Sequence, residues 1–175
     1  MKLISETERL IIRQLTLDDA EFIIQLLNEE SFIRYIADKN VRTHADAVNY
    51  LMNGPLASYR DYGFGLNVIL LKETTTPIET TTPIGICGLL KRAELDYPDL
   101  GYAFLTEFCQ KGYATEAAFS VLNAGMKAHS LDTVLAVTLL DNERSNRLLQ
   151  KIGFELKGTM ALYGSQNNVY EYMSA

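Results

Sequence analysis

The stretch from residue 100 to residue 128 constrains the fold most, because it predicts a strand, a polar turn and a helix in immediate succession. Residues 100–105 are apolar and aromatic, and residues 106–111 interrupt them with polar and charged side chains. Small and apolar residues then recur at helical spacing, namely Ala118, Val121, Leu122 and Gly125. A helix that begins directly after such a turn leaves backbone N–H groups without intrachain acceptors, where its dipole is positive. The stretch therefore predicts a binding site for an anion such as a diphosphate.

The turn at the centre of this stretch resembles the cofactor turn of the GNAT acyltransferase superfamily. The family pattern is Gln or Arg, two free positions, Gly, one free position, and Gly or Ala. Gly112 and Ala114 match its last two fixed places, whereas the first falls on Cys109, so one side-chain contact of the family is not matched here. The resemblance implies that backbone amides of the turn bind the cofactor diphosphate. The residues concerned are Cys109, Gln110, Lys111, Gly112, Tyr113, Ala114 and Thr115.

A second motif follows after a strand-like segment. Residues 142–154 contain, in order, all fixed residues of the other GNAT signature: Asn142, Ser145, Leu148, Gly153 and Phe154. Residues 6–13, which read Glu-Thr-Glu-Arg-Leu-Ile-Ile-Arg, resemble the first strand of one branch, the ribosomal-protein N-terminal acetyltransferase-like enzymes. The resemblance covers nearly the whole chain.

This resemblance implies a mixed α/β (α+β) fold with three layers. Its central sheet would be mixed but mostly antiparallel, with six or seven strands, a splayed central strand pair and helices on both faces. The sequence order agrees, since strand-like and helical segments are mixed along the chain from residue 10 to residue 173. Thr16 with Asp19, and Thr43 with Asp46, have the spacing of capping boxes at two early helices.

Composition limits the class of protein. The 175 residues, 47% hydrophobic and 22% charged, are typical of one folded domain covering residues 1–175. A net charge of −6 argues against nucleic-acid binding and leaves a cationic substrate open. No apolar run approaches the roughly 18 residues of a membrane span, so we expect no membrane partner. Two cysteines and two histidines favour a reducing, cytoplasmic location and no metal site.

One segment has no role in this scheme. Residues 73–78 and 79–84 are identical hexapeptides, Glu-Thr-Thr-Thr-Pro-Ile. Because proline cannot donate a hydrogen bond to a sheet, we expect an extended hairpin tip or a loop there, without chemistry.

The resemblance implies transfer of an acetyl group from acetyl-CoA to a primary amine by direct attack in a ternary complex. Backbone groups of Tyr102, Ala103 and Phe104 would pair with the pantetheine arm of the cofactor. Lys111 and Arg147, with Arg144 and Lys151, would add positive charge near the diphosphate, or simply lie on solvated helix surfaces. Asn142 would cap its helix, contact the cofactor, or do both.

Two residues are candidates for proton transfer. Ser145 lies one helical turn after Asn142, where its hydroxyl could donate to the departing sulfur. Asp99, at the start of the central strand, could act as general base, although such an Asp is often a turn residue and a water chain would serve an amine of low pKa.

The acceptor and the assembly stay open at this point. The branch resemblance favours a protein N-terminal α-amine of the ribosomal-protein type, and small-molecule amines are the alternative. A domain that binds acyl-CoA as a sensor, without turnover, is a third possibility. Both a monomer and a homodimer are compatible with the sequence.

Overall fold

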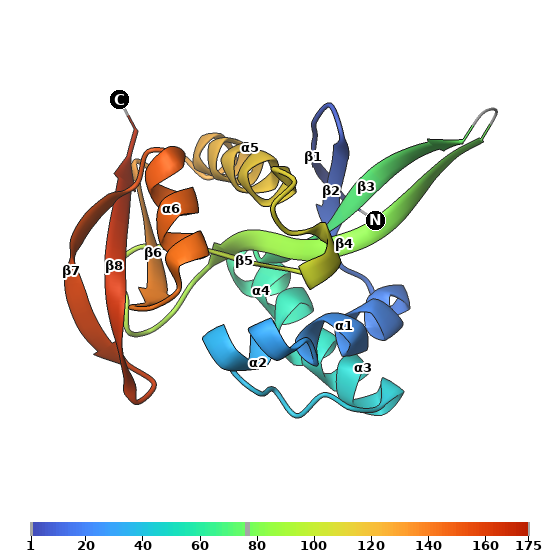
Figure 1. The fold of residues 1–175 in the computed structure, drawn as a ribbon, viewed down its shortest axis with the longest axis horizontal. Coiled ribbons are helices and arrows are strands. Elements are labelled where there is room, and N and C mark those ends of the chain that lie inside the picture. The colour runs from blue at the N-terminus through green and yellow to red at the C-terminus, as the bar shows by residue number, and fades with distance from the viewer. Residues whose placement is uncertain (1, 76–77, 175) are drawn as a thin grey trace.

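The computed structural model describes residues 2–75 and 78–174, and these form eight strands in one sheet with the order β1-β2-β3-β4-β5-β6-β8-β7 (Figure 1). All neighbouring strands are antiparallel except β5 and β6, which are parallel. The strands are β1 (Leu3–Glu6), β2 (Leu10–Gln14), β3 (Leu66–Thr75), β4 (Ile78–Leu90), β5 (Asp99–Phe104), β6 (Thr133–Leu139), β7 (Glu155–Leu162) and β8 (Ser165–Met173).

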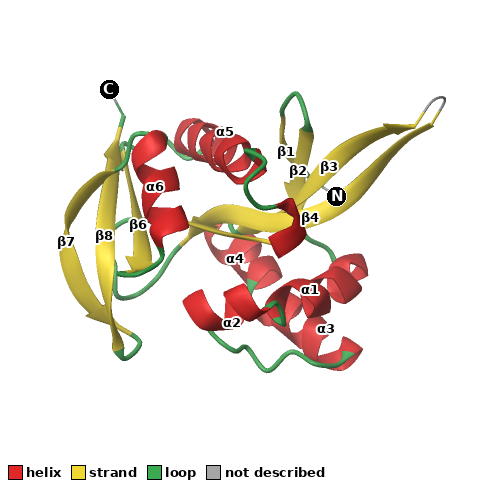
Figure 2. Ribbon diagram, viewed as in Figure 1, coloured by secondary structure: helices red, strands yellow, loops and turns green. Residues whose placement is uncertain are grey.

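Helices cover both faces of this sheet (Figure 2). The helices are α1 (Ala20–Leu27), α2 (Glu30–Tyr35), α3 (His44–Asn53), α4 (Pro55–Tyr62), α5 (Tyr113–Ala128) and α6 (Glu143–Lys151). Helices α1 to α3 share one buried cluster with the sheet, and α5 and α6 share another on the opposite face. No helix in the described part of the chain is long and apolar enough to cross a membrane. The mixed three-layer architecture is confirmed.

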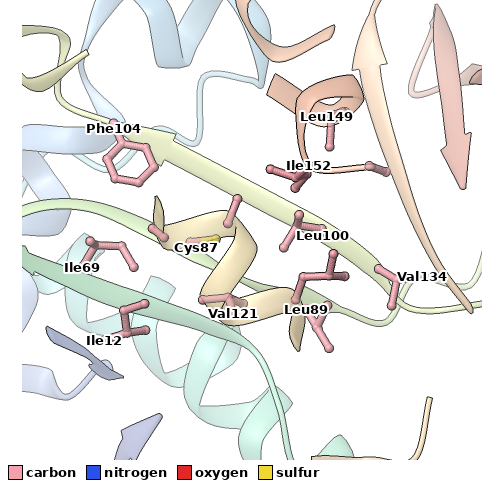
Figure 3. Packing of buried hydrophobic residues seen from close by; sticks show 14 of the residues in the cluster. Ile12, Ile69, Cys87, Leu89, Leu100, Phe104, Val121, Val134, Leu149 and Ile152 are labelled. Atoms are coloured by element: carbon pink, nitrogen blue, oxygen red, sulfur yellow. The ribbon is translucent and has the colours of Figure 1, made fainter. Parts of the chain in front are cut away.

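The central strands are buried on both faces, which explains their continuous apolar runs. In β3, Val68 and Leu70 pack toward α1 and α3, while Ile69 and Leu71 pack toward α5. This alternation follows from the two-residue period of a strand. Each fully buried side chain of this size contributes about 1.5–3 kcal/mol to folding. Figure 3 shows the cluster on the α5 face, where Ile12, Ile69, Cys87 and Val121 lie together.

Small residues let α5 approach the sheet closely, as the sequence predicts. Ala117 and Ala118 are fully buried against it. At Gly125 a Cβ atom would come within 2.6 Å of Leu89 Cδ1, so a larger residue there would force the Leu89 side chain or the helix to shift. This packing fixes the start of α5, and therefore the turn before it, relative to β4 and β5.

The central pair of strands is splayed. Among the described residues, β5 and β6 pair only where Asp99 lies beside Leu135, and the Leu135 N–H donates to the Pro98 carbonyl at 2.9 Å. Beyond this pair the two strands run in different directions (Figure 1). Residues 100–104 of β5 and 136–139 of β6 do not pair with each other, and we call these two stretches the β5–β6 fork.

Several local expectations are confirmed, and two elements were missed. Both predicted capping boxes are present, at Thr16 and Thr43. The duplicated hexapeptides lie in the hairpin of β3 and β4, although residues 76 and 77 fall outside the described part. The sheet has eight strands, where six or seven were expected, because β1 also pairs. Helix α4 was not predicted, since Pro55 is its one buried residue and it has little apolar pattern.

Candidate active site

The turn before α5 has the geometry of an anion site. Gln110 and Gly112 adopt positive φ angles of 64° and 85°, on either side of Lys111. In the described part of the chain, no acceptor takes the backbone N–H groups of residues 110–115, whereas the Glu116 N–H donates to the Gly112 carbonyl. Such consecutive free N–H groups at the positive end of a 16-residue helix suit a diphosphate.

The side chain at the unmatched motif position is a half-buried thiol. Cys109 Sγ lies 3.6 Å from the Leu105 carbonyl oxygen, to which it donates a weak hydrogen bond. Burial raises the pKa of this thiol, and the charge of the nearby Arg144 guanidinium partly offsets that rise. Arg144 of α6 therefore reaches the turn, which brings both sequence motifs to one place.

The backbone of β5 faces the fork at alternate residues. The Leu105 N–H donates to the Ile84 carbonyl of β4. Because N–H and C=O groups alternate in direction along a strand, Ala103 also directs its backbone to β4, while Tyr102 and Phe104 direct theirs to β6. Of the three predicted residues, Tyr102 and Phe104 thus present backbone groups to the fork, and Ala103 does not.

Two hydroxyl groups meet across the fork. Tyr102 Oη of β5 and Ser145 Oγ of α6 are 2.5 Å apart and share a hydrogen bond, in which either can donate. Tyr102 Oη also lies 3.4 Å from the Ser145 carbonyl oxygen. Burial raises the pKa of the Tyr102 phenol, so it keeps its proton at neutral pH. The Tyr102 side chain therefore takes part in the candidate site, in addition to the backbone groups that the sequence predicted.

Asn142 and Asn146 hold the start of α6 beside β6. Asn142 caps the helix, and its Oδ1 accepts from the Ser145 N–H at 3.4 Å. Thr138 Oγ1 donates to Asn146 Oδ1 at 2.5 Å, and Asn168 Nδ2 donates to the same oxygen at 3.2 Å. These bonds link α6 to β6 and β8. Ser145 is therefore held through Asn142 on one side of it in the sequence and through Asn146 on the other.

Asp99 lies at the base of the fork and is fully buried. Both of its carboxylate oxygens accept from Arg92 Nε, at 3.0 and 3.1 Å. Burial raises the pKa of Asp99, and the charge of Arg92 opposes this rise. Because the carboxylate is paired and closed to solvent, its placement does not support the general-base role.

The predicted cations lie at different places. Lys111 is exposed in the turn, with Nζ 5.9 Å from the centre of the Phe108 ring. Arg147 is exposed on α6, two positions after Ser145. Side chains two positions apart in a helix point in nearly opposite directions, so Arg147 points away from Ser145. Arg144, not Arg147, is the α6 cation beside the turn.

Comparison with known proteins decides the family. Residues 9–155 match the family model described as an acetyltransferase (GNAT) domain. The chain belongs to the GNAT family. It is 32% identical over 164 residues to the N-acetyltransferase YoaA of Bacillus subtilis, an alignment that covers 94% of this chain and 89% of that protein. The GNAT resemblance read from the two motifs is confirmed, and the chain is an acetyl-CoA-dependent N-acetyltransferase.

Two solved GNAT structures share its fold. One is the microcin C7 self-immunity acetyltransferase MccE in complex with acetyl-CoA and AMP, with a TM-score of 0.78 and 18% identity, covering 96% of this chain and 94% of that one. The other is RimL, the ribosomal L7/L12 α-N-protein acetyltransferase, in complex with coenzyme A, with a TM-score of 0.78 and 15% identity, covering 98% of both chains. At these identities the likeness concerns the GNAT fold alone.

The sequence did not reveal the side chains that surround these GNAT motifs. Arg9 lies at the turn, and Arg92 pairs with Asp99. Arg9 does fall within the segment that resembles the first strand of one GNAT branch, which was the available signal. Arg92 carried no signal, because its partner is recognised only from the fold.

Proposed function

We propose that this GNAT enzyme binds acetyl-CoA in the β5–β6 fork and transfers the acetyl group to a protein N-terminal α-amine by direct attack in a ternary complex. The observation that carries the proposal is that the β5 edge left free in the fork leads within a few residues to the unpaired N–H groups of residues 110–115, with Arg144 of α6 beside Cys109, which lies between them. One surface thus offers a strand edge for an extended arm and unpaired N–H groups for a diphosphate.

The backbone of the chain supplies the binding groups. N–H groups of residues 110–115 would hold the diphosphate, with Lys111 and Arg144 as nearby cations. Backbone groups of Tyr102 and Phe104 would pair with the pantetheine arm as a strand pairs with a sheet edge. Acetyl-CoA supplies an activated thioester, whose C–S bond breaks as the new C–N bond forms.

The Tyr102 and Ser145 hydroxyls hold the proton that the leaving thiolate requires. When Tyr102 Oη donates to Ser145 Oγ, the Ser145 hydrogen is free to point into the fork. A donor that is itself hydrogen-bonded in this way is polarised and becomes a better acid. Ser145 would then pass its proton to the thiolate while Tyr102 keeps its own, and the proton that the amine releases to water would restore the Ser145 hydroxyl.

The acceptor amine loses its proton to water, because the Asp99 carboxylate is buried and paired with Arg92. The ion pair of Asp99 with Arg92 holds the base of the fork, where β5 and β6 separate. An N-terminal α-amine, with a pKa of about 8, is already partly neutral near pH 7 and needs no dedicated base.

Two considerations favour a protein N-terminus as acceptor. The segment of residues 6–13 resembles the ribosomal-protein branch, and RimL, which acts on a protein α-amine, has the same fold over 98% of the chain. A small-molecule amine is the second candidate, because MccE has an equal TM-score.

An acceptor panel tests this proposal. Purified enzyme receives acetyl-CoA with peptides that begin with Ser, Ala or Met, and thiol release is followed while mass spectrometry locates the acetyl group. Matched controls are the same peptides with a blocked N-terminus, together with polyamines, amino acids and aminoglycosides. We expect release only with free N-termini. Thiol release with only the small amines would favour a small-molecule acceptor. Thiol release that persists when the peptide N-terminus is blocked would contradict transfer to the α-amine.

A further inference from the structure

Arg9, which lies directly before β2, reaches the turn before α5 although about a hundred residues separate them in sequence. Its Nε donates to Glu116 Oε1 at 2.9 Å, and its Nη1 donates to the Lys111 carbonyl at 3.0 Å. The guanidinium lies 4.5 Å from the centre of the Tyr113 ring. The side chain of Arg9 is 40% exposed, so it is held by these contacts and not by burial.

The bond to Lys111 orients the turn. The Lys111 carbonyl and the Gly112 N–H belong to one trans peptide, in which they point in opposite directions. Because Arg9 holds the carbonyl on its own side, the Gly112 N–H points away from Arg9. Arg9 thus lies behind the turn and keeps the N–H of Gly112 directed outward, as an anion requires.

The bond to Glu116 removes an opposing charge. Glu116 lies in the first turn of α5, next to the N–H groups that would receive the diphosphate. Partial burial alone would raise the pKa of its carboxyl, but hydrogen bonds from Thr7 and Arg9 outweigh burial and lower that pKa. Glu116 is therefore ionised at neutral pH and would repel a diphosphate if Arg9 did not neutralise it.

Gly112 leaves room for this arrangement. A Cβ atom at Gly112 would come within 3.2 Å of Arg9 Nη2, and the φ of 85° there disfavours any other residue. In the described part of the chain Nη2 has no acceptor of its own. The guanidinium is thus in van der Waals proximity to the centre of the turn.

We propose that Arg9 is a positioning residue for cofactor binding, which orients the turn of residues 110–115 and neutralises Glu116 so that the turn accepts a diphosphate. This inference rests on the proposed binding of acetyl-CoA at that turn. It predicts that Arg9 affects affinity for the phosphorylated part of the cofactor and leaves the chemistry at the thioester unaffected.

The test measures the dissociation constant of CoA by calorimetry and that of pantetheine, which lacks the diphosphate, by NMR titration. We expect Arg9→Gln to weaken CoA binding about tenfold or more, since one unneutralised charge lies beside the anion. Pantetheine affinity should change less than twofold, and turnover at saturating acetyl-CoA should stay the same. Arg9→Lys, which keeps the charge but not the forked geometry of the guanidinium, should lose less CoA affinity than Arg9→Gln.

The matched control is Glu116→Gln, alone and combined with Arg9→Gln. The single Glu116→Gln variant should bind CoA at least as tightly as the wild type, and the double variant should recover most of the affinity lost in Arg9→Gln. Wild-type affinity in Arg9→Gln, an equal loss for pantetheine, or no recovery in the double variant would overturn the inference. If the wild type itself binds no CoA, the proposed function fails instead, so the two failures are distinguishable.

Discussion

The hydroxyl pair of Tyr102 and Ser145 makes the sharpest prediction about chemistry. Ser145→Ala removes the group that faces the thiolate, and general acid catalysis contributes about 10²–10⁴-fold to a rate. Because water can enter the space of the lost hydroxyl, we expect kcat to fall about 100-fold, at the low end of that range. The KM for acetyl-CoA should change little, because binding relies on backbone groups elsewhere.

Tyr102→Phe should act through Ser145. It removes one neutral hydrogen bond, at an Oη to Oγ distance of 2.5 Å, whose net contribution is about 1–1.5 kcal/mol, or about tenfold in rate. If Tyr102 acts only by polarising Ser145, the double variant should be no slower than Ser145→Ala alone, a strong departure from additivity.

The assay is steady-state thiol release at saturating acceptor, with thermal melting to confirm folding. Ser120→Ala is the matched control, because Ser120 of α5 also shares a hydroxyl-to-hydroxyl hydrogen bond, with Ser5, at a partly buried position outside the fork. Unchanged kcat in Ser145→Ala would refute the proton-donor role of Ser145. Losses in the two single variants that multiply in the double variant would refute the claim that Tyr102 acts through Ser145.

Three further predictions concern the base of the fork, the turn and the hairpin. Asp99→Asn leaves the Arg92 charge without a counter-charge, so chemical denaturation should show a loss of about 3 kcal/mol, with kcat of the folded enzyme within a few-fold of wild type; a large fall in kcat would restore Asp99 as the base. Gly112→Ala and Gly164→Ala both place a side chain at positive φ, at 85° and 82°, and should each lose about 1–2 kcal/mol. Calorimetry should show weaker CoA binding for Gly112→Ala alone, because Gly112 lies in the turn that would bind the diphosphate, beside Arg9, whereas nothing lies within 4 Å of a Cβ at Gly164. Equal CoA affinities of the two variants would contradict the assigned turn. Deleting residues 73–78 should leave CoA affinity unchanged, and a large loss would show that the hairpin takes part in binding.

Local features of the fold could be predicted from the sequence. The two capping boxes and the helix α5 depend on residues a few positions apart: the spacing of Thr and Asp identified the boxes, and the periodicity of small and apolar residues identified α5. The turn and the start of α6 were located by motifs of fixed spacing. Asn142 and Ser145 accordingly lie together as expected.

Long-range features could not be predicted in the same way. The bond of Arg9 to Glu116 joins residues 107 positions apart, and that of Tyr102 to Ser145 joins residues 43 positions apart. From sequence, Asp99 is a candidate general base or a turn residue, and only the fold shows that its carboxylate is paired with Arg92. Periodicity also says nothing of strand register, so it could not show that Ala103 turns its backbone to β4.

The central claim is that the N–H groups of residues 110–115 bind the cofactor diphosphate, and NMR of the ¹⁵N-labelled enzyme tests it most directly. We predict that CoA shifts the amide resonances of this turn strongly, and that pantetheine, without the diphosphate, leaves them nearly unchanged while still shifting amides of β5. Saturation with CoA that leaves the turn resonances in place would contradict the account.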